Sequence, residues 1–214
     1  MTSSLETRAP IDAWLARVLA CELDDETART LREEPLCHLL QCLEPQLGSV
    51  WPLATDAEDD RRDREDFARL FLLPGGLPPR AGAFLPGAPA LAEGHATAMV
   101  DRALDLLGRR AVSRSPWGRL PRDHFALILE LVAHASCSDD PIDRSLAREL
   151  DAALLGPRLV AFGEALAEAA EHPVYRAIGR LVALTHDEDG PHDPLPADAP
   201  SETGARRDRA GSRA

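Results

Sequence analysis

The sequence predicts an all-α protein, and three observations support that prediction. Apolar residues recur at helical spacing from residue 10 to about residue 185. Segments rich in proline and glycine interrupt this pattern, as expected of connections between helices. No two alternating apolar segments are joined by a hairpin turn. We therefore expect a single multi-helix bundle over residues 1–185 and a disordered, acidic, Pro/Arg-rich tail over residues 186–214.

The expected helices follow in order along the chain. A first apolar stripe starts after Pro10, a second starts at Leu36, and an acidic helix with a Thr55/Glu58 capping box leads to Phe67. Residues 73–90 should form an irregular loop, because they include five prolines and four glycines. The later helices are predicted over 91–107, 123–137, 142–155, 159–170 and 174–184, with a connector that Trp117 anchors over 108–121. Segment 123–137 is apolar on most faces, so we expect it at the centre of the bundle.

Charge and composition exclude several classes of function. The chain has 214 residues and a formal charge of −12, which argues against nucleic acid as the main partner. All 24 cationic side chains are arginine. Without lysine, neither a Walker-A site nor Schiff-base chemistry is possible.

The thiols indicate a reducing compartment. No apolar segment near the N-terminus resembles a signal peptide, and no run is long enough to span a membrane. No C-x-x-C pair occurs, and we therefore expect a cytoplasmic protein with free, buried thiols. The pairs Cys37/His38 and His134/Cys137 fit no standard zinc spacing, so neither a metal nor another cofactor is predicted. The four cysteines are Cys21, Cys37, Cys42 and Cys137.

The first candidate site segment joins an amphipathic helix to the long loop. Phe67, Leu70 and Phe71 share one helix face and stand just before Pro74-Gly75-Gly76. Such a face is commonly part of the core. Beside a long loop, however, it can also form a groove with a movable lid.

The second candidate segment is Asp123-His124, which opens the most apolar helix. Asp123 could serve simply as an N-cap, or its carboxylate could bind a guanidinium beside an apolar surface. His124 could make that site sensitive to pH or satisfy a carbonyl group. Glu130 and the acidic run 56–66 are further candidates for contacts with arginine.

Together, these segments resemble the TorD/DmsD family of chaperones. The first family signature is similar to Phe67-Ala68-Arg69-Leu70-Phe71-Leu72-Leu73-Pro74-Gly75, which continues through Pro78-Pro79. The second is similar to Asp123-His124 and the helix that ends in His134, and a late family segment resembles His172-Pro173-Val174-Tyr175. The chain departs from the family pattern at Arg80, where tryptophan is common, and also at Gly82, Phe84, Arg122 and Ile128.

The resemblance implies an all-helical bundle of the TorD-like type without enzymatic activity. Such a protein binds the twin-arginine signal peptide of a molybdopterin-dependent oxidoreductase, holds the apoenzyme during cofactor insertion and delays export. The oligomeric state stays open between a monomer and a domain-swapped dimer, because the loop at 73–90 could fold back or act as a hinge for swapping. The candidate peptide-binding residues are Phe67, Leu70, Phe71, Pro79, Arg80, Asp123, His124 and Glu130.

Two other functions remain open from the sequence. A small helical metal-dependent hydrolase could use Asp123 with His124, His134 or His95. A structural adaptor could instead present the acidic helical surface to a partner protein.

Overall fold

The structure, a computed structural model, describes residues 5–23, 27, 30, 36–47, 57–84, 89–107 and 119–187. Within these ranges the chain forms eight α-helices, one π-helical turn and one 3-10 helix. Its only extended pairing there is an isolated bridge between Arg80 and His124. The all-α prediction is confirmed for this part of the chain. Thr55, Trp117 and residues 188–214 of the expected tail lie outside the described ranges.

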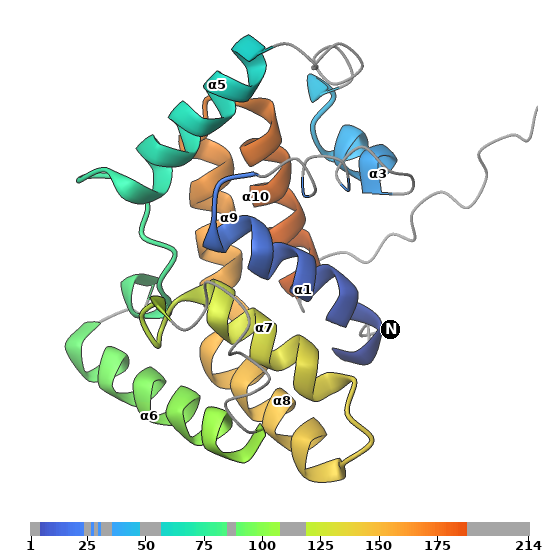
Figure 1. Cartoon of the computed structure of the whole chain (residues 1–214), viewed down its shortest axis with the longest axis vertical. Coiled ribbons are helices and arrows are strands. Elements are labelled where there is room, and N and C mark those ends of the chain that lie inside the picture. The colour runs from blue at the N-terminus through green and yellow to red at the C-terminus, as the bar shows by residue number, and fades with distance from the viewer. Residues whose placement is uncertain are drawn as a thin grey trace, which may run out of the picture.

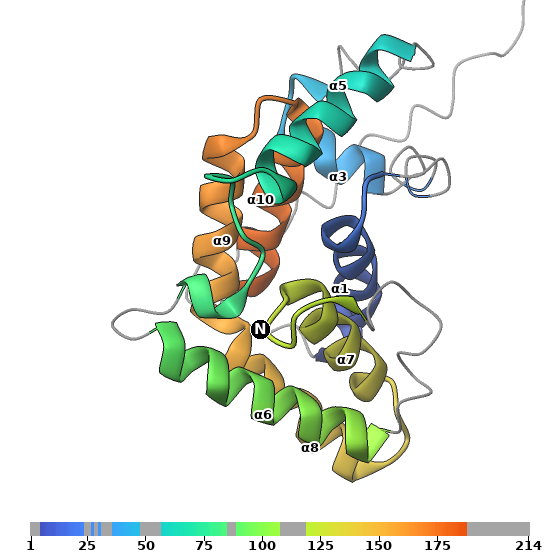
Figure 2. The same ribbon diagram turned by 60° about the vertical axis from the view of Figure 1, so that its left-hand side comes forward.

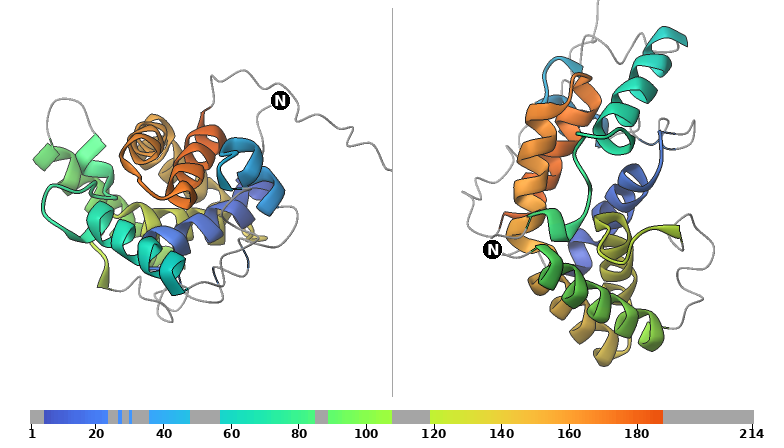
Figure 3. Two further views of the ribbon diagram at one scale, coloured as in Figure 1. Left: turned by 90° about the horizontal axis from the view of Figure 1, so that it is seen from above. Right: turned by 90° about the vertical axis from the view of Figure 1, so that its left-hand side faces the viewer.

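The helices form two packed groups that meet where α1 contacts α10 and where α8 contacts α9. Helices α9 and α10 lie side by side, and α3 contacts α10 (Figure 1). Helix α1 crosses α7, which packs on α8, and α6 runs along α8 (Figure 2). Helix α5 lies near the connection from α9 to α10 (Figure 3). The bounds are α1 Leu5–Ala20, α3 Leu36–Leu43, α5 Ala57–Phe67, α6 Pro89–Leu107, α7 Phe125–Ser136, α8 Pro141–Leu154, α9 Gly156–Ala169 and α10 Pro173–His186.

Helix α7 occupies the centre, as its composition predicts. Every side chain from Phe125 to Ser136 is buried except those of Glu130 and His134. Helices α1 and α8 cover two of its faces. Each large apolar side chain buried in this way contributes roughly 1.5–3 kcal/mol relative to exposure, so enclosing α7 drives the association of the surrounding helices.

Helices α9 and α10 approach so closely that their backbones touch. A Cβ atom added at Gly163 would lie 2.6 Å from the Gly179 carbonyl oxygen and 2.8 Å from the Ala183 nitrogen. One added at Gly179 would lie 2.6 Å from both the Ala167 nitrogen and the Gly163 oxygen. Only glycine permits this spacing, so these two positions determine how α9 and α10 pack.

The glycine contact gives a stability prediction. We expect Gly179→Ala to lower the free energy of unfolding by about 1–3 kcal/mol, because the helices must move apart to admit the methyl group. Gly94→Ala is the matched control, since Gly94 lies within α6 and an added Cβ meets nothing within 4 Å. The free energy of unfolding of this control should rise by about 0.5–1 kcal/mol, because alanine has a higher helix propensity than glycine. Urea denaturation measures both values, and equal effects at the two sites would contradict the proposed close packing.

A buried ionic cluster connects α1, α8 and α10. The Arg8 guanidinium donates to Asp12 at 2.9 Å and also to Asp151. The Nε2 atom of His186 lies 3.2 Å from the other Asp12 oxygen. Burial disfavours the charged guanidinium, but Asp12 and Asp151 together raise the pKa of Arg8 above its ordinary value. The cluster explains why an aspartate can lie within the first apolar stripe.

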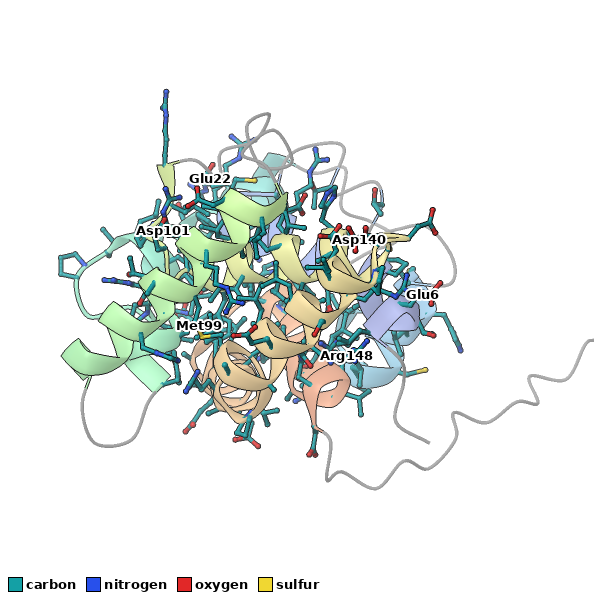
Figure 4. All side chains as sticks on the ribbon, turned by 90° about the horizontal axis from the view of Figure 1, so that it is seen from below. Glu6, Glu22, Met99, Asp101, Asp140 and Arg148 are labelled. Atoms are coloured by element: carbon teal, nitrogen blue, oxygen red, sulfur yellow. The ribbon has the colours of Figure 1, made fainter. Side chains whose placement is uncertain are left out.

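Removing the cation from this cluster should destabilise the fold. Arg8→Leu would leave the buried carboxylates of Asp12 and Asp151 without their guanidinium, at a cost of roughly 3–5 kcal/mol. The control is Arg148→Leu on the exposed face of α8, where a change within about 0.5 kcal/mol is expected. Figure 4 shows Arg148 on α8, which runs beside α6. Thermal unfolding distinguishes the variants, and equal melting temperatures would show that the cluster contributes little.

The expectation that the thiols are buried was wrong. Cys42 and Cys137 are exposed, and Cys21 and Cys37 are partly exposed.

Some local expectations were also wrong. Helix α1 begins at Leu5 and runs through Pro10, although the sequence suggested a start after that proline. Residues 73–90 are not irregular throughout, because Ala81–Phe84 is a 3-10 helix and α6 begins at Pro89. Proline is well suited to a first helical position, where its missing N–H has no helical partner.

Candidate functional site

The first candidate segment ends in a π-helical turn rather than in an ordinary helix terminus. Over Ala68–Leu72 the helix widens, and the Leu73 N–H donates to the Ala68 carbonyl at 2.9 Å. Such turns are rare and are frequently found at functional sites. The chain then folds back, so that the Leu77 N–H donates to the Leu70 carbonyl.

The two glycines of Pro74-Gly75-Gly76 make this return possible. Gly75 has a φ of +88°, a conformation that residues with side chains rarely adopt. A Cβ atom at Gly76 would lie 2.5 Å from the Leu70 oxygen and 2.6 Å from the Arg69 oxygen. A side chain at Gly76 would therefore open the turn, and one at Gly75 would strain its backbone.

The predicted apolar face is largely internal. Phe67 and Leu70 are buried, and Phe71 is partly buried against them. The Phe67 and Phe71 ring centroids are 5.0 Å apart, and each lies about 6 Å from Tyr175 of α10. These rings anchor the turn to the bundle.

An apolar surface nonetheless remains open beside the turn. Leu72 is 64% exposed and Leu73 is 58% exposed. Exposed Leu73 and buried Leu70 both line a cavity of about 270 Å³. Its other lining residues are Arg69, Pro74, Gly75, Gly76, Leu77 and Ala169.

A short extended strap connects the two candidate segments. The Phe125 N–H donates to the Pro79 carbonyl at 2.9 Å, and the Ala81 N–H donates to the Asp123 carbonyl at 2.8 Å. Pro79 is buried beneath this pairing. Residues 77–81 thus run from the π-helical turn to the start of α7, and the structure brings the two sequence signatures into contact.

At the end of the strap, the Asp123 carboxylate forms a salt bridge with the guanidinium of Arg80. Arg80 Nε lies 2.9 Å and Nη2 lies 2.8 Å from the Asp123 Oδ1 atom. The carboxylate is only 2% exposed, whereas 35% of the Arg80 side chain remains accessible. The N-cap role considered for Asp123 was wrong, because His124 is the N-cap of α7.

His124 is a neutral hydrogen-bond acceptor at physiological pH. Its Nδ1 atom accepts from the Ala126 N–H at 3.2 Å, which satisfies an otherwise free donor in the first turn. Burial lowers the pKa of His124 to about 4; Asp123 opposes this shift and Arg80 reinforces it. The imidazole therefore supplies no positive charge near Asp123 at neutral pH.

The lowered pKa predicts acid sensitivity. Between pH 6.5 and about 4 the unfolded chain binds a proton at His124 that the folded chain does not. Stability should therefore fall as the pH decreases through this window, by about 3 kcal/mol in total from this group. His124→Asn keeps a capping acceptor but does not titrate. Urea denaturation from pH 7 to 4 should show a shallower loss for the variant, and identical slopes would refute the prediction.

Glu130 lies at a different place from Asp123 and His124. It lines a cavity of about 470 Å³ between α1 and α7, together with His134 and Cys137. Burial raises the pKa of Glu130, while His134 opposes the shift. The other lining residues are Ala9, Pro10, Ala13, Ala133 and Ser138. Neither Asp123 nor His124 lines this cavity.

Sequence reasoning missed a polar junction where α5 meets the start of α10. The Asp66 Oδ2 atom accepts from the backbone N–H groups of Glu171 and His172 at 3.1 and 2.8 Å. The Oδ1 atom of Asp66 accepts from the Arg69 guanidinium, which also donates to the Ala169 carbonyl at 2.7 Å. One acid of the 56–66 run thus fixes the two residues just before α10, whose N-cap is His172. No local signal in the sequence indicates this role, because the partners are more than 100 residues away.

No family model, curated protein or solved structure matches the chain. Within the described ranges, no three His, Cys, Asp or Glu side chains come together as a metal site would require. None of the described helices has both the length and the apolar character needed to cross a bilayer. The case for a function therefore depends on the residues of the chain itself.

Proposed function

We propose that the protein is a cytoplasmic chaperone of the TorD/DmsD type. It binds the twin-arginine signal peptide of a molybdopterin-dependent oxidoreductase, assists cofactor insertion and delays export until the enzyme is mature. The observation that carries this proposal is the guanidinium held by the buried Asp123 carboxylate. An arginine side chain fits this position, and the position opens to solvent.

The apolar part of the ligand has a matching surface. Exposed Leu72 and Leu73 and the cavity beside them lie at one end of the strap, and Asp123 lies at the other. A signal peptide carries two arginines followed by an apolar segment, so one peptide could contact both ends. Apolar anchors supply affinity and paired charges supply specificity in such recognition.

The buried aromatic residues support this surface from beneath. Phe67 and Phe71 fix the turn against Tyr175, and the strap fixes the backbone on either side of Arg80. A rigid receptor loses little conformational entropy on binding. The peptide itself must become ordered, at a cost of about 2–5 kcal/mol, which keeps its affinity moderate and allows release.

Peptide titration tests the proposal. A synthetic twin-arginine leader should bind the full-length chain, and Leu73→Ser should weaken binding by about 1–2 kcal/mol, because less apolar area is buried. The matched control is Leu106→Ser on α6, a leucine that is also exposed (52%). Isothermal titration calorimetry measures all three affinities. The proposal fails if the wild-type chain does not bind the leader, or if it binds a leader with a polar segment in place of the apolar one equally well.

The adaptor alternative makes a different prediction. An adaptor would capture its partner through the acidic helical surface even after the signal peptide is deleted. Co-purification of an oxidoreductase with and without its leader distinguishes the two functions. The hydrolase alternative has no observation in its favour, because Asp123 is engaged by Arg80 and His124 Nδ1 accepts from the backbone.

A further inference from the structure

The pairing of Arg80 with Asp123 has an unusual asymmetry. Both guanidinium nitrogens approach the same oxygen, Oδ1, at 2.9 and 2.8 Å. An ideal arginine–carboxylate fork pairs two nitrogens with two oxygens in parallel. The geometry of Arg80 is therefore compatible with replacement by a guanidinium that approaches from solvent and aligns with both oxygens.

Burial also differs between the two partners. With Arg80 in place, only 2% of the Asp123 side chain is exposed. Arg80 lies at the mouth of the site with 35% of its side chain accessible. A buried carboxylate without a partner is costly, so Asp123 favours the presence of some cation at all times. Without a competing cation, Arg80 therefore leaves the site open for only a small fraction of the time.

The backbone around Arg80 does not have to move during such an exchange. The residues on either side are fixed by the hydrogen bonds of Pro79 and Ala81 to the start of α7. Only the flexible arginine side chain needs to rotate outward. Side-chain rotation into solvent is fast, and it recovers rotamer entropy.

We propose that Asp123 forms a guanidinium site that Arg80 occupies in the free protein and that an arginine of a bound peptide takes over. This inference rests on the proposed function for the identity of the peptide, but not for the site itself. Arg80 then acts as an internal competitor. The apparent affinity for the peptide is the intrinsic affinity multiplied by the fraction of time that the site is free of Arg80. Ligands without an arginine are disfavoured, because they cannot supply a positive charge in place of the Arg80 guanidinium.

The first experiment uses a small guanidinium as the probe. Arg80→Ala should have a lower melting temperature than the wild type, and millimolar ethylguanidinium chloride should raise it. The same salt should leave the wild type and the double variant Arg80→Ala/Asp123→Asn unchanged relative to sodium chloride at equal ionic strength. Arg80→Gln provides a second background that retains part of the side chain. The guanidinium site is refuted if ethylguanidinium stabilises neither Arg80→Ala nor Arg80→Gln more than the same variant that also carries Asp123→Asn.

The second experiment measures peptide affinity. The twin-arginine leader should bind Arg80→Ala about tenfold more tightly than the wild type if Arg80 occupies the site about 90% of the time. Arg80→Lys retains the positive charge and should show a smaller gain. Asp123→Asn should abolish the gain in either background.

The outcomes separate this inference from the proposed function. If the wild type binds the leader and Arg80→Ala binds it no more tightly, the competition is refuted while the chaperone function stands. If ethylguanidinium stabilises Arg80→Ala through Asp123 but no form binds the leader, the guanidinium site stands and the proposed function fails.

Discussion

The enclosure of α7 is the constraint on which the rest of the structure depends. Ten of its twelve side chains are buried, so the helix requires cover on nearly every face. Helices α1 and α8 supply much of that cover, and Phe84 and Phe162 pack against Phe125 at its first turn. Because the start of α7 is buried too, its free N–H groups need partners within the protein. His124 and the carbonyl of Pro79 provide them.

The need to satisfy the N–H groups at the start of α7 also determines where the Asp123 carboxylate lies. The strap that satisfies the start of α7 also carries Arg80, and the register of the bridge sets Arg80 opposite His124 and next to Asp123. The carboxylate is thereby buried, with its charge balanced by an arginine side chain that remains 35% exposed. Packing of the core and the proposed recognition chemistry thus arise from the same few hydrogen bonds.

The candidate residues of the sequence do not form one continuous patch. Asp123, His124, Pro79 and Arg80 lie together, and the strap connects them to the turn formed by Leu70. Phe67 supports that turn from within the core. Glu130 belongs to a different cavity against α1, because successive turns of a central helix face different neighbours. The acidic run contributes Asp66 to the connection that precedes α10 rather than to an open surface.

Local chemistry in the sequence determined which segments are helical, that α7 lies at the centre, and that Pro74-Gly75-Gly76 ends a helix. Helical period and turn propensity depend on residues three or four positions apart, so a single sequence displays them. Only the tertiary structure decided that Arg80 meets Asp123, that Gly163 touches Gly179, and that a π-helical turn precedes the loop. Those contacts join residues that are 16 to 43 positions apart, or depend on backbone packing, and local pattern carries no information about which distant groups will meet once the core closes.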